Sequence, residues 1–266
     1  MATMTAVKTE TAPAAADATA AATAANPAAA IPADDAQLSL EEFAGVNERR
    51  ARSYELLARL YAREVDRALL DELRTMRFPV STGNADVDEG MRLVAGYLSN
   101  VWDGTVQELA VDYVHCFIGS GMDAFSAAYP YESVYTSPKR LMMQEARDEV
   151  LAIYRSQGLD KAKEWKESEV HVAAECTFMA TLATRTAQAC RAGDEDAVES
   201  LLKTQLNFLS DHLYAWTGMM TADMRGYART DLYRGLAAYT DGFLTSDRET
   251  LAGVLGVDLD VEEDCR

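Results

Sequence analysis

The stretch 129-YPYESVYTSPKRLMMQEARDEVLAIYRSQG-158 places a clearly delimited helix directly after an aromatic loop. Ser137 is a suitable N-cap, and Pro138 suits the first helical position because its ring already has a helical φ. Gly158 is a natural stop. Four apolar side chains can share one helical stripe: Leu141, Val150, Leu151 and Tyr154. The pattern predicts a helix that begins at Ser137 and ends before Gly158.

The loop before this helix is rich in rings. It contains Tyr129, Pro130, Tyr131 and Tyr135. A loop of this kind can expose aromatic side chains at a cleft while a rigid helix holds them in place. The same tyrosines could instead close one edge of the core. Spacing alone leaves both interpretations open.

Residues 1–36 differ from the rest of the chain. They form an Ala/Thr tract with scattered Pro and almost no large apolar residue, so burial cannot offset the entropy of ordering them. Lys8 is the only basic residue near the start, and the first arginine is Arg49, so the segment resembles neither a secretory signal nor an arginine-rich transit peptide. We expect a disordered tail over residues 1–36 and one domain over residues 37–266.

Helical spacing dominates the sequence after this tail. Ser39 and Glu42 form a capping box, and no stretch shows sustained alternation with β-branched enrichment. No repeat of 20–50 residues is visible either. The predicted class is therefore all-α, a single helical bundle. Besides the helix after Ser137, helices are expected after Ser39, around 69–76, over 86–102, before Gly119, over 169–192, after Asp194 or Asp196, and over 224–244, with a long loop over 119–137.

Charge and cysteine usage limit the classes of partner. The formal net charge is −18, which argues against a nucleic-acid partner and permits a cationic one, although acidity can also serve solubility alone. No apolar run is long enough to span a bilayer. The cysteines, which show no CxxC spacing, are expected to be reduced in a cytoplasm-like compartment: Cys116, Cys176, Cys190 and Cys265.

The chain lacks the common motifs of catalysis. There is no phosphate-binding glycine loop and no GxSxG elbow, and there are only three histidines. His171 and Glu175 share a helix face, as do Asp112 and His115, but a di-metal bundle needs Glu-x-x-His pairs, which this sequence lacks. These patterns favour a protein that is not an enzyme and that holds no metal or other cofactor.

Six segments in order carry a resemblance to a known family: FIGSG, YPYESVY, YRSQG, VHVAAECTFMATL, FLSDHLYAWTGMM and LYRGLAAYTDGFL. Over about residues 51–244 the chain resembles the TorD/DmsD family of redox-enzyme maturation chaperones. The resemblance implies a TorD-like all-helical fold and a cytoplasmic chaperone without catalysis of its own. Its client would be a molybdopterin oxidoreductase catalytic subunit of the dimethyl sulfoxide or trimethylamine N-oxide reductase type. The chaperone would hold the client's twin-arginine leader until the cofactor is inserted.

The same resemblance implies a leader-binding region made of three segments. Before His171 the family usually has a Pro and an acidic residue, whereas this chain has Ser168 and Val170, so Glu167 or Glu169 would have to substitute. The implied residues are Tyr113, Phe117, Pro130, Tyr131, Glu132, Ser133, Tyr135, Glu169, His171 and Glu175.

The chemistry of a twin-arginine leader agrees with this region. Such a leader is a basic segment followed by an apolar one, and its recognition requires an apolar groove with carboxylates at one end. The rings of Phe117, Tyr131 and Tyr135 can supply the groove. The expected carboxylates are Glu132, Glu167, Glu169 and Glu175.

Other functions stay open. The chain could be an assembly chaperone for a nitrate reductase-type subunit that is never exported, or, from a different class, a nucleotide- or metal-dependent helical enzyme. The oligomeric state is also open. A monomer is possible, and so is a domain-swapped dimer in which residues 158–168 act as a hinge.

Overall fold

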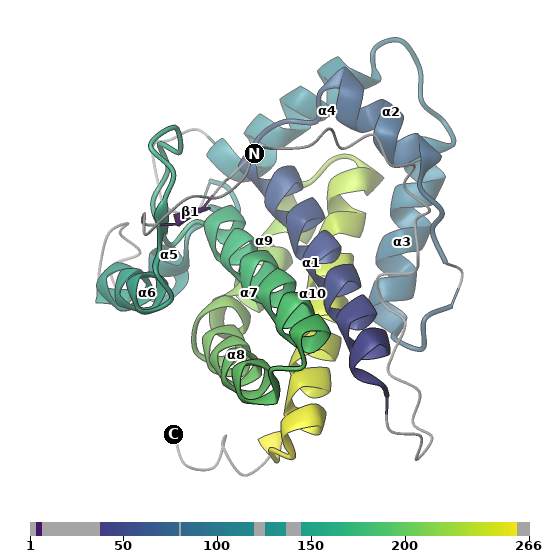
Figure 1. Cartoon of the computed structure of the whole chain (residues 1–266). Coiled ribbons are helices and arrows are strands. Elements are labelled where there is room, and N and C mark those ends of the chain that lie inside the picture. Colours follow the sequence, from purple (N-terminus) through teal and green to yellow (C-terminus); the bar gives the residue numbers. More distant parts are fainter. Residues whose placement is uncertain (1–3, 7–37, 80, 120–125, 137–144, 260–266) are drawn as a thin grey trace.

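The computed structural model describes residues 4–6, 38–79, 81–119, 126–136 and 145–259, and most of these residues are helical, which confirms the all-α prediction (Figure 1). The α-helices are α1 (Leu40–Ala62), α2 (Arg67–Thr75), α3 (Ala85–Leu98), α4 (Thr105–Tyr113), α5 (Glu132–Thr136), α6 (Glu145–Ser156), α7 (Val172–Ala192), α8 (Glu195–Phe208), α9 (Tyr214–Tyr227) and α10 (Asp231–Leu255). Two single π-turns continue α4 and α8, namely η1 (Val114–Ile118) and η2 (Leu209–Leu213).

Two helix pairs form the centre of the bundle. α1 packs along α7, and α3 packs along α10, while α5 and α6 lie on the side of α7 away from α3 (Figure 1). Large side chains from these helices and from α9 fill the interior. Fully buried examples are Tyr54, Leu57, Tyr61, Phe178, Trp216 and Tyr233.

Local capping fixes several helix ends as expected. The backbone N–H of Glu42 donates to the Ser39 hydroxyl at 3.3 Å, and the N–H of Ser39 donates to the Glu42 carboxylate at 2.9 Å, which confirms the capping box. Asp194 caps α8, and its carboxylate accepts the backbone N–H of Ala197 at 3.0 Å. α7 ends at Ala192, and the φ of 69° at the following Gly193 lies in the left-handed region that glycine tolerates.

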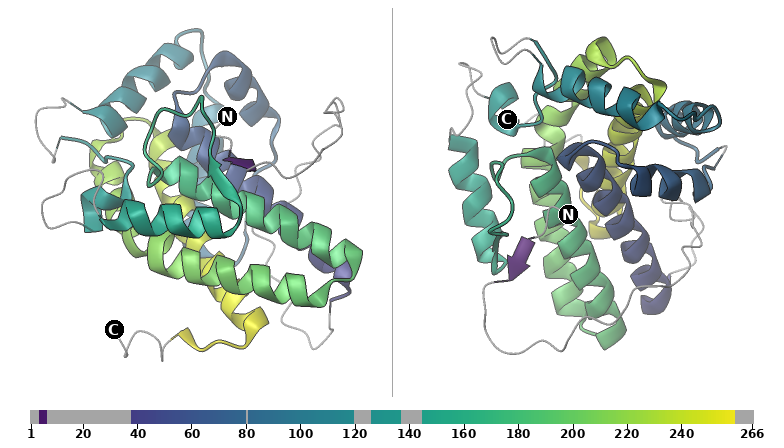
Figure 2. Two further views of the ribbon diagram at one scale, coloured as in Figure 1. Left: turned by 60° about the vertical axis from the view of Figure 1, so that its left-hand side comes forward. Right: turned by 90° about the horizontal axis from the view of Figure 1, so that it is seen from above.

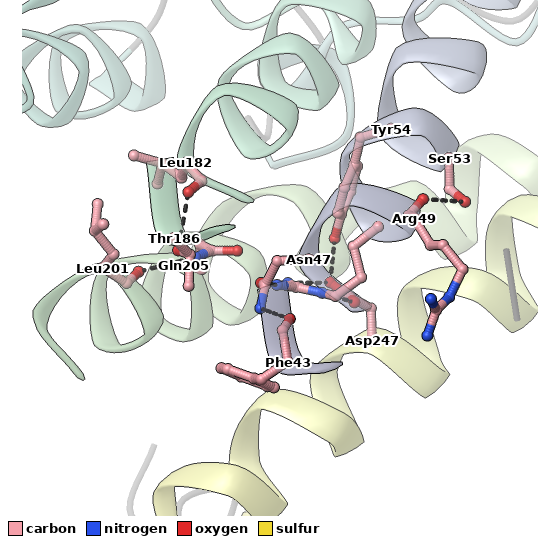
Figure 3. A network of polar contacts seen from close by, with 11 residues as sticks. Phe43, Asn47, Arg49, Ser53, Tyr54, Leu182, Thr186, Leu201, Gln205 and Asp247 are labelled. Atoms are coloured by element: carbon pink, nitrogen blue, oxygen red, sulfur yellow. Dashed lines mark hydrogen bonds and ion pairs between the residues drawn. The ribbon is translucent and has the colours of Figure 1, made fainter. Parts of the chain in front are cut away.

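A buried polar network joins α1 to α10 (Figure 3). The guanidinium of Arg50 donates to both Asp247 carboxylate oxygens at 2.5 and 2.9 Å, and it also donates to Asn47. Tyr54 donates to the same Asp247 carboxylate at 2.7 Å. Because every member has a partner, the network links the two helices and leaves none of its buried charges unpaired.

Four helix boundaries differ from the prediction. α10 continues to Leu255 and does not end near Leu244. At the other three boundaries, side chains or loops capture backbone groups. α3 ends at Leu98 and not at Trp102, and the side-chain amide of Asn100 donates to the backbone carbonyl of Gly96 at 2.9 Å. The predicted helix over 224–244 is two helices. The break falls where the N–H groups of Arg229 and Thr230 donate to the Asp112 carboxylate.

α7 begins at Val172 and not at Glu169, because residues before it pair with the loop at 130–132. That loop was predicted to lack regular structure, but it contains α5, a single helical turn. The predicted helix start at Ser137 and Pro138 lies outside the described residues, and the described part of that helix is α6.

Two short strands were not predicted. β1 (Met4–Ala6) pairs antiparallel with β2 (Leu159–Lys161), and the three residues of β1 are the only described part of the expected disordered tail.

Cys116, Cys176 and Cys190 are buried and free. None of the described helices combines the length and the apolarity that a membrane crossing requires.

Candidate functional site

The aromatic loop and the start of α7 are held together through their backbones. The N–H of Glu132 donates to the carbonyl of Val170 at 3.0 Å, and the N–H of Val172 donates to the carbonyl of Pro130 at 3.0 Å. Tyr131 and His171 thus face one another across an isolated antiparallel bridge. Two of the three segments implied by the family resemblance are therefore adjacent in space.

His171 caps α7 with its own ring. Nδ1 accepts a hydrogen bond from the backbone N–H of Ala173 at 3.0 Å, which requires Nδ1 to be unprotonated. The ring lies edge-on to Tyr131 and to Trp165, with centroid distances of 5.0 and 5.3 Å. Burial lowers the pKa of His171 to about 3, so the imidazole is neutral at neutral pH. Its role here is to position the helix start.

A buried polar cluster lies behind α5. Glu132 Oε1 is 3.0 Å from Nδ1 of His212, and the indole N–H of Trp216 donates to Glu175 Oε2 at 3.2 Å. Burial, with the neighbouring Glu132 carboxylate as a second cause, raises the pKa of Glu175 well above its ordinary value. The remaining oxygens of both carboxyl groups and the Ser133 hydroxyl have no hydrogen-bond partner among the described residues.

His212 and Trp216 were not among the residues expected from the sequence. They are four residues apart in FLSDHLYAWTGMM, so they could have been assigned to one helix face from their spacing. The pattern does not say that this face meets α5, because that contact joins residues 80 positions apart in the sequence.

Glu169 is buried but fully paired. Arg147 donates to it at 2.7 Å, and the ammonium of Lys161 lies 3.2 Å from its carboxylate. Although burial acts in the opposite direction, the hydrogen bonds from Arg147 and Lys161 hold the pKa of Glu169 below its ordinary value. Its carboxylate therefore links α6 and β2 to the start of α7.

Tyr113 and Phe117 lie in the core. The Tyr113 hydroxyl donates to the carbonyl of Tyr61 at 2.8 Å, and the Phe117 ring packs edge-on against Tyr61 and Tyr233. Both side chains are less than a tenth exposed. Their described contacts are therefore internal ones.

Two tyrosines of the loop reach the surface, and each donates to a carboxylate. The Tyr131 hydroxyl donates to Glu167 at 2.5 Å, and the Tyr135 hydroxyl donates to Asp223 at 3.1 Å. Tyr131 directly precedes α5, and Tyr135 lies within this single helical turn. Trp165 is half-buried, and its ring contacts His171, the residue that the Tyr131 ring also contacts. We call Tyr131, Tyr135, Trp165, Glu167 and Asp223 the tyrosine–acid surface.

This surface rests on the buried cluster. The Tyr135 ring stacks on Trp216, with centroids 5.7 Å apart and planes inclined by 22°. Trp216 in turn donates to Glu175. Of the four carboxylates expected from the sequence, only Glu167 is exposed, while Glu132, Glu169 and Glu175 are buried. The arrangement offers rings and carboxylates at the surface and a fixed polar layer below them.

A groove of about 650 Å³ lies elsewhere, between α1, α2 and α7. Its lining includes Ala58, Arg59, Leu69, Thr181 and Arg185, and none of the expected site residues belongs to it. Among the described residues, no group of three or more His, Cys, Asp or Glu side chains is arranged to hold a metal ion.

Comparison with known proteins shows that the chain is similar to members of one family. The family model described as nitrate reductase delta subunit matches residues 84–222, from the start of α3 into α9. A chaperone protein TorD from Photobacterium profundum is 28% identical over 184 residues, which are 66% of this chain and 82% of the relative. One from Vibrio cholerae is 27% identical over 219 residues, which are 80% of this chain and 96% of the relative. One from Aliivibrio salmonicida is 24% identical over 222 residues and is matched along its full length.

Proposed function

Because this chain belongs to the family of nitrate reductase delta subunits and TorD-type redox-enzyme maturation chaperones, we propose that it binds the twin-arginine leader and the apo form of a molybdopterin oxidoreductase subunit. The client is of the dimethyl sulfoxide or trimethylamine N-oxide reductase type. The chaperone acts in the cytoplasm and supports cofactor insertion before export. It performs no catalysis of its own.

The tyrosine–acid surface is the observation that carries this proposal. Glu167 and Asp223 each already accept a tyrosine hydroxyl, so each presents a fixed carboxylate. A guanidinium donates in a planar fork that fits a carboxylate in two parallel bonds. The Tyr131 and Tyr135 rings beside these carboxylates offer apolar area to the residues that follow the arginines.

The net charge supports the same partner. At −18 the chain attracts a basic segment over a longer range than the contacts themselves. A leader that carries two arginines therefore meets both a favourable long-range field and the carboxylates of the tyrosine–acid surface. Both contributions should weaken as the salt concentration rises, because charges exposed to solvent are screened.

The buried residues of the expected site have a supporting role in this proposal. Glu132, His212, Glu175 and Trp216 fix α5 against α7 and α9, and His171 fixes the start of α7. We expect a substitution of any of these residues to shift Tyr131 and Tyr135 without removing a direct contact to the leader. Tyr113 and Phe117 are core residues, so the proposal gives them no direct contact with the leader.

The test is a set of Tyr131 variants titrated with a synthetic twin-arginine leader in a calorimeter. Tyr131→Ala should weaken binding by about 1–3 kcal/mol, which is the usual cost of truncating an aromatic anchor. Tyr131→Phe keeps the ring but loses the hydrogen bond to Glu167, so its loss should be smaller.

The matched control is Trp102→Ala, which removes a ring that is 62% exposed in the link between α3 and α4. Its affinity for the leader should equal that of the unchanged chain. Equal losses for Tyr131→Ala and Trp102→Ala, or no loss for either, would mean that the leader binds elsewhere.

A second client class is favoured by the family description itself, which names a nitrate reductase subunit. A non-exported client of that type offers no twin-arginine leader, so the chaperone would contact its folded body or another segment. Pull-down of an apo-subunit with and without its leader separates the two. The leader-dependent proposal requires capture to fall when the leader is removed.

A further inference from the structure

The N-terminus of this chain pairs with an internal strand next to the candidate site. Met4 lies opposite Lys161, Thr5 opposite Asp160 and Ala6 opposite Leu159. β1 also contacts α7, and Figure 2 shows it alongside that helix. Within the residues that the structure describes, these are the only two strands of three residues.

β2 is anchored on one side and connected to the tyrosine–acid surface on the other. Leu159 and Ala162 are 2% and 3% exposed, so their side chains hold the strand against the body. The Lys161 ammonium donates to the carbonyl of Glu167 at 3.0 Å. The carboxylate of the same Glu167 accepts the Tyr131 hydroxyl. Glu167 therefore connects β2 to Tyr131, the proposed contact of the leader.

The pairing itself is of a kind that another peptide can replace. A strand that adds to an exposed edge is held by main-chain hydrogen bonds and needs little side-chain complementarity. Two strands of three residues are marginal in water by themselves. The attachment of β1 through residues 7–37 supplies it at a high effective concentration, which keeps a weak pair formed.

We propose that this edge of β2 is a strand-addition site for the apolar segment of the client's leader and that Met4–Ala6 occupy it in the free chaperone. The inference rests on the proposed function. β1 consists of Met, Thr and Ala and carries no charge, so it resembles the part of a leader that follows the arginines. With that apolar segment on β2, the arginines lie within reach of Glu167.

The N-terminal segment is then an intramolecular competitor. If β1 fills the edge nine-tenths of the time, the apparent affinity for the leader is about tenfold below the intrinsic one, because only the open fraction binds. Binding of the leader releases β1. A chaperone with a competitor of this kind discriminates against weak peptides, which do not displace it.

Two full-length variants test this competition. In Met4→Pro/Thr5→Pro, two adjacent N–H groups are removed, and because neighbouring N–H groups of a strand point to opposite sides, one of them faces β2. In the control, Met4→Val/Thr5→Val, the donors and the strand propensity are retained. Each is titrated with a synthetic peptide that bears two arginines followed by an apolar segment. Amide hydrogen exchange of Leu159–Lys161 is measured with and without the peptide.

The expected result is tighter peptide binding by the proline variant, up to about tenfold, and unchanged binding by the valine control. Protection of Leu159–Lys161 should fall in the free proline variant and return when the peptide is added. Unchanged protection in the free proline variant overturns the pairing, and equal or weaker peptide binding overturns the competition. If no form of the chain binds the peptide, the proposed function fails and the inference with it.

Discussion

Glu132 and His212 are joined inside the protein, with 3.0 Å between Oε1 and Nδ1, although they lie 80 residues apart in the sequence. Both side chains are almost completely buried. The contact attaches α5, a helix of one turn, to the π-turn that precedes α9. A short helix has little stability by itself, so the position of Tyr131 and Tyr135 depends on this attachment.

The first prediction separates a buried carboxylate from an exposed one. The sequence suggested that Glu132 contacts the leader's arginines directly, but Glu132 is 2% exposed whereas Glu167 is exposed. Glu167→Gln should weaken leader binding by about 0.5–2 kcal/mol, and the effect should shrink as salt rises. Any effect of Glu132→Gln on binding should be insensitive to salt. Calorimetry at two salt concentrations checks both, and a salt-dependent Glu132→Gln effect would mean that α5 opens to admit the leader.

The second prediction concerns acid. His171 has a pKa of about 3 in the folded chain against 6.5 for a free imidazole, so the unfolded state binds the proton first. The stability that His171 contributes is present above pH 6.5 and is lost as the pH falls from 6.5 toward 3. His171→Asn keeps an N-cap acceptor without this titration and should show a smaller loss of melting temperature in that range. Identical acid profiles for the two proteins would contradict the assignment.

His171→Ala tests the cap itself. It removes the acceptor for the Ala173 N–H, so the chain should lose about 0.5–2 kcal/mol at neutral pH, the usual cost of a lost N-cap. Urea denaturation measures this loss. His171→Asn is the matched comparison and should lose less.

The third prediction concerns the stability that Glu175 contributes as the pH rises. The pKa of Glu175 is raised in the folded chain, so its contribution to stability is present below the ordinary value of 4.5 and is lost as the pH rises through the raised pKa. Glu175→Gln keeps an acceptor for the Trp216 indole and has no proton to lose. Its melting temperature should fall less than that of the unchanged chain as the pH rises. A parallel decline in both would contradict the raised pKa.

The fourth prediction compares two glycines of α3. A Cβ on Gly90 would lie 2.5 Å from the backbone nitrogen of Tyr239 and 2.7 Å from the carbonyl oxygen of Gly235, so α3 and α10 would have to separate. Gly90→Ala should cost about 1–3 kcal/mol of stability. Gly96→Ala has nothing within 4 Å and should stabilise by up to about 1 kcal/mol through helix propensity. Chemical denaturation gives both values. Equal effects of the two substitutions on stability would contradict the close approach of α3 and α10 at Gly90.

The fifth prediction concerns the network of α1 and α10. Asp247→Asn leaves the Arg50 guanidinium buried without its counter-charge and should cost about 3–5 kcal/mol. Tyr54→Phe removes only one hydrogen bond to the same carboxylate and should cost about 1 kcal/mol. Urea denaturation of the two variants checks the ratio. Similar losses of stability in the two variants would mean that the Arg50–Asp247 ion pair is not the main stabilising contact between α1 and α10 in this network.

Local signals made most of the fold predictable. The Ser39 capping box and the stop at Gly193 depend on neighbouring residues, so the sequence marks these helix ends directly. The break before α10 does not, because the group that captures the N–H of Thr230 is Asp112, 118 residues away. The strand pair was missed for the same reason, since Met4 and Lys161 each lack a strand-like context of their own.

The site was predictable to a lesser degree. The resemblance selected a loop and a helix start that lie next to one another in the structure, with their backbones paired. Exposure was not predictable, because a glutamate in a loop sequence looks the same whether it faces solvent or a buried histidine. Glu132 was expected at the surface and lies against His212, while Asp223, which accepts the Tyr135 hydroxyl, was not anticipated.

The most direct test of the central claim is a calorimetric comparison of two leaders on the unchanged chain. One carries the twin-arginine pair, and the other carries two lysines in a sequence that is otherwise the same. We predict weaker binding of the lysine leader, because an ammonium cannot form the two parallel bonds of a guanidinium with the carboxylates of the tyrosine–acid surface. Tyr131→Ala should weaken the binding of both leaders. Equal affinity of the unchanged chain for the two leaders would contradict the account.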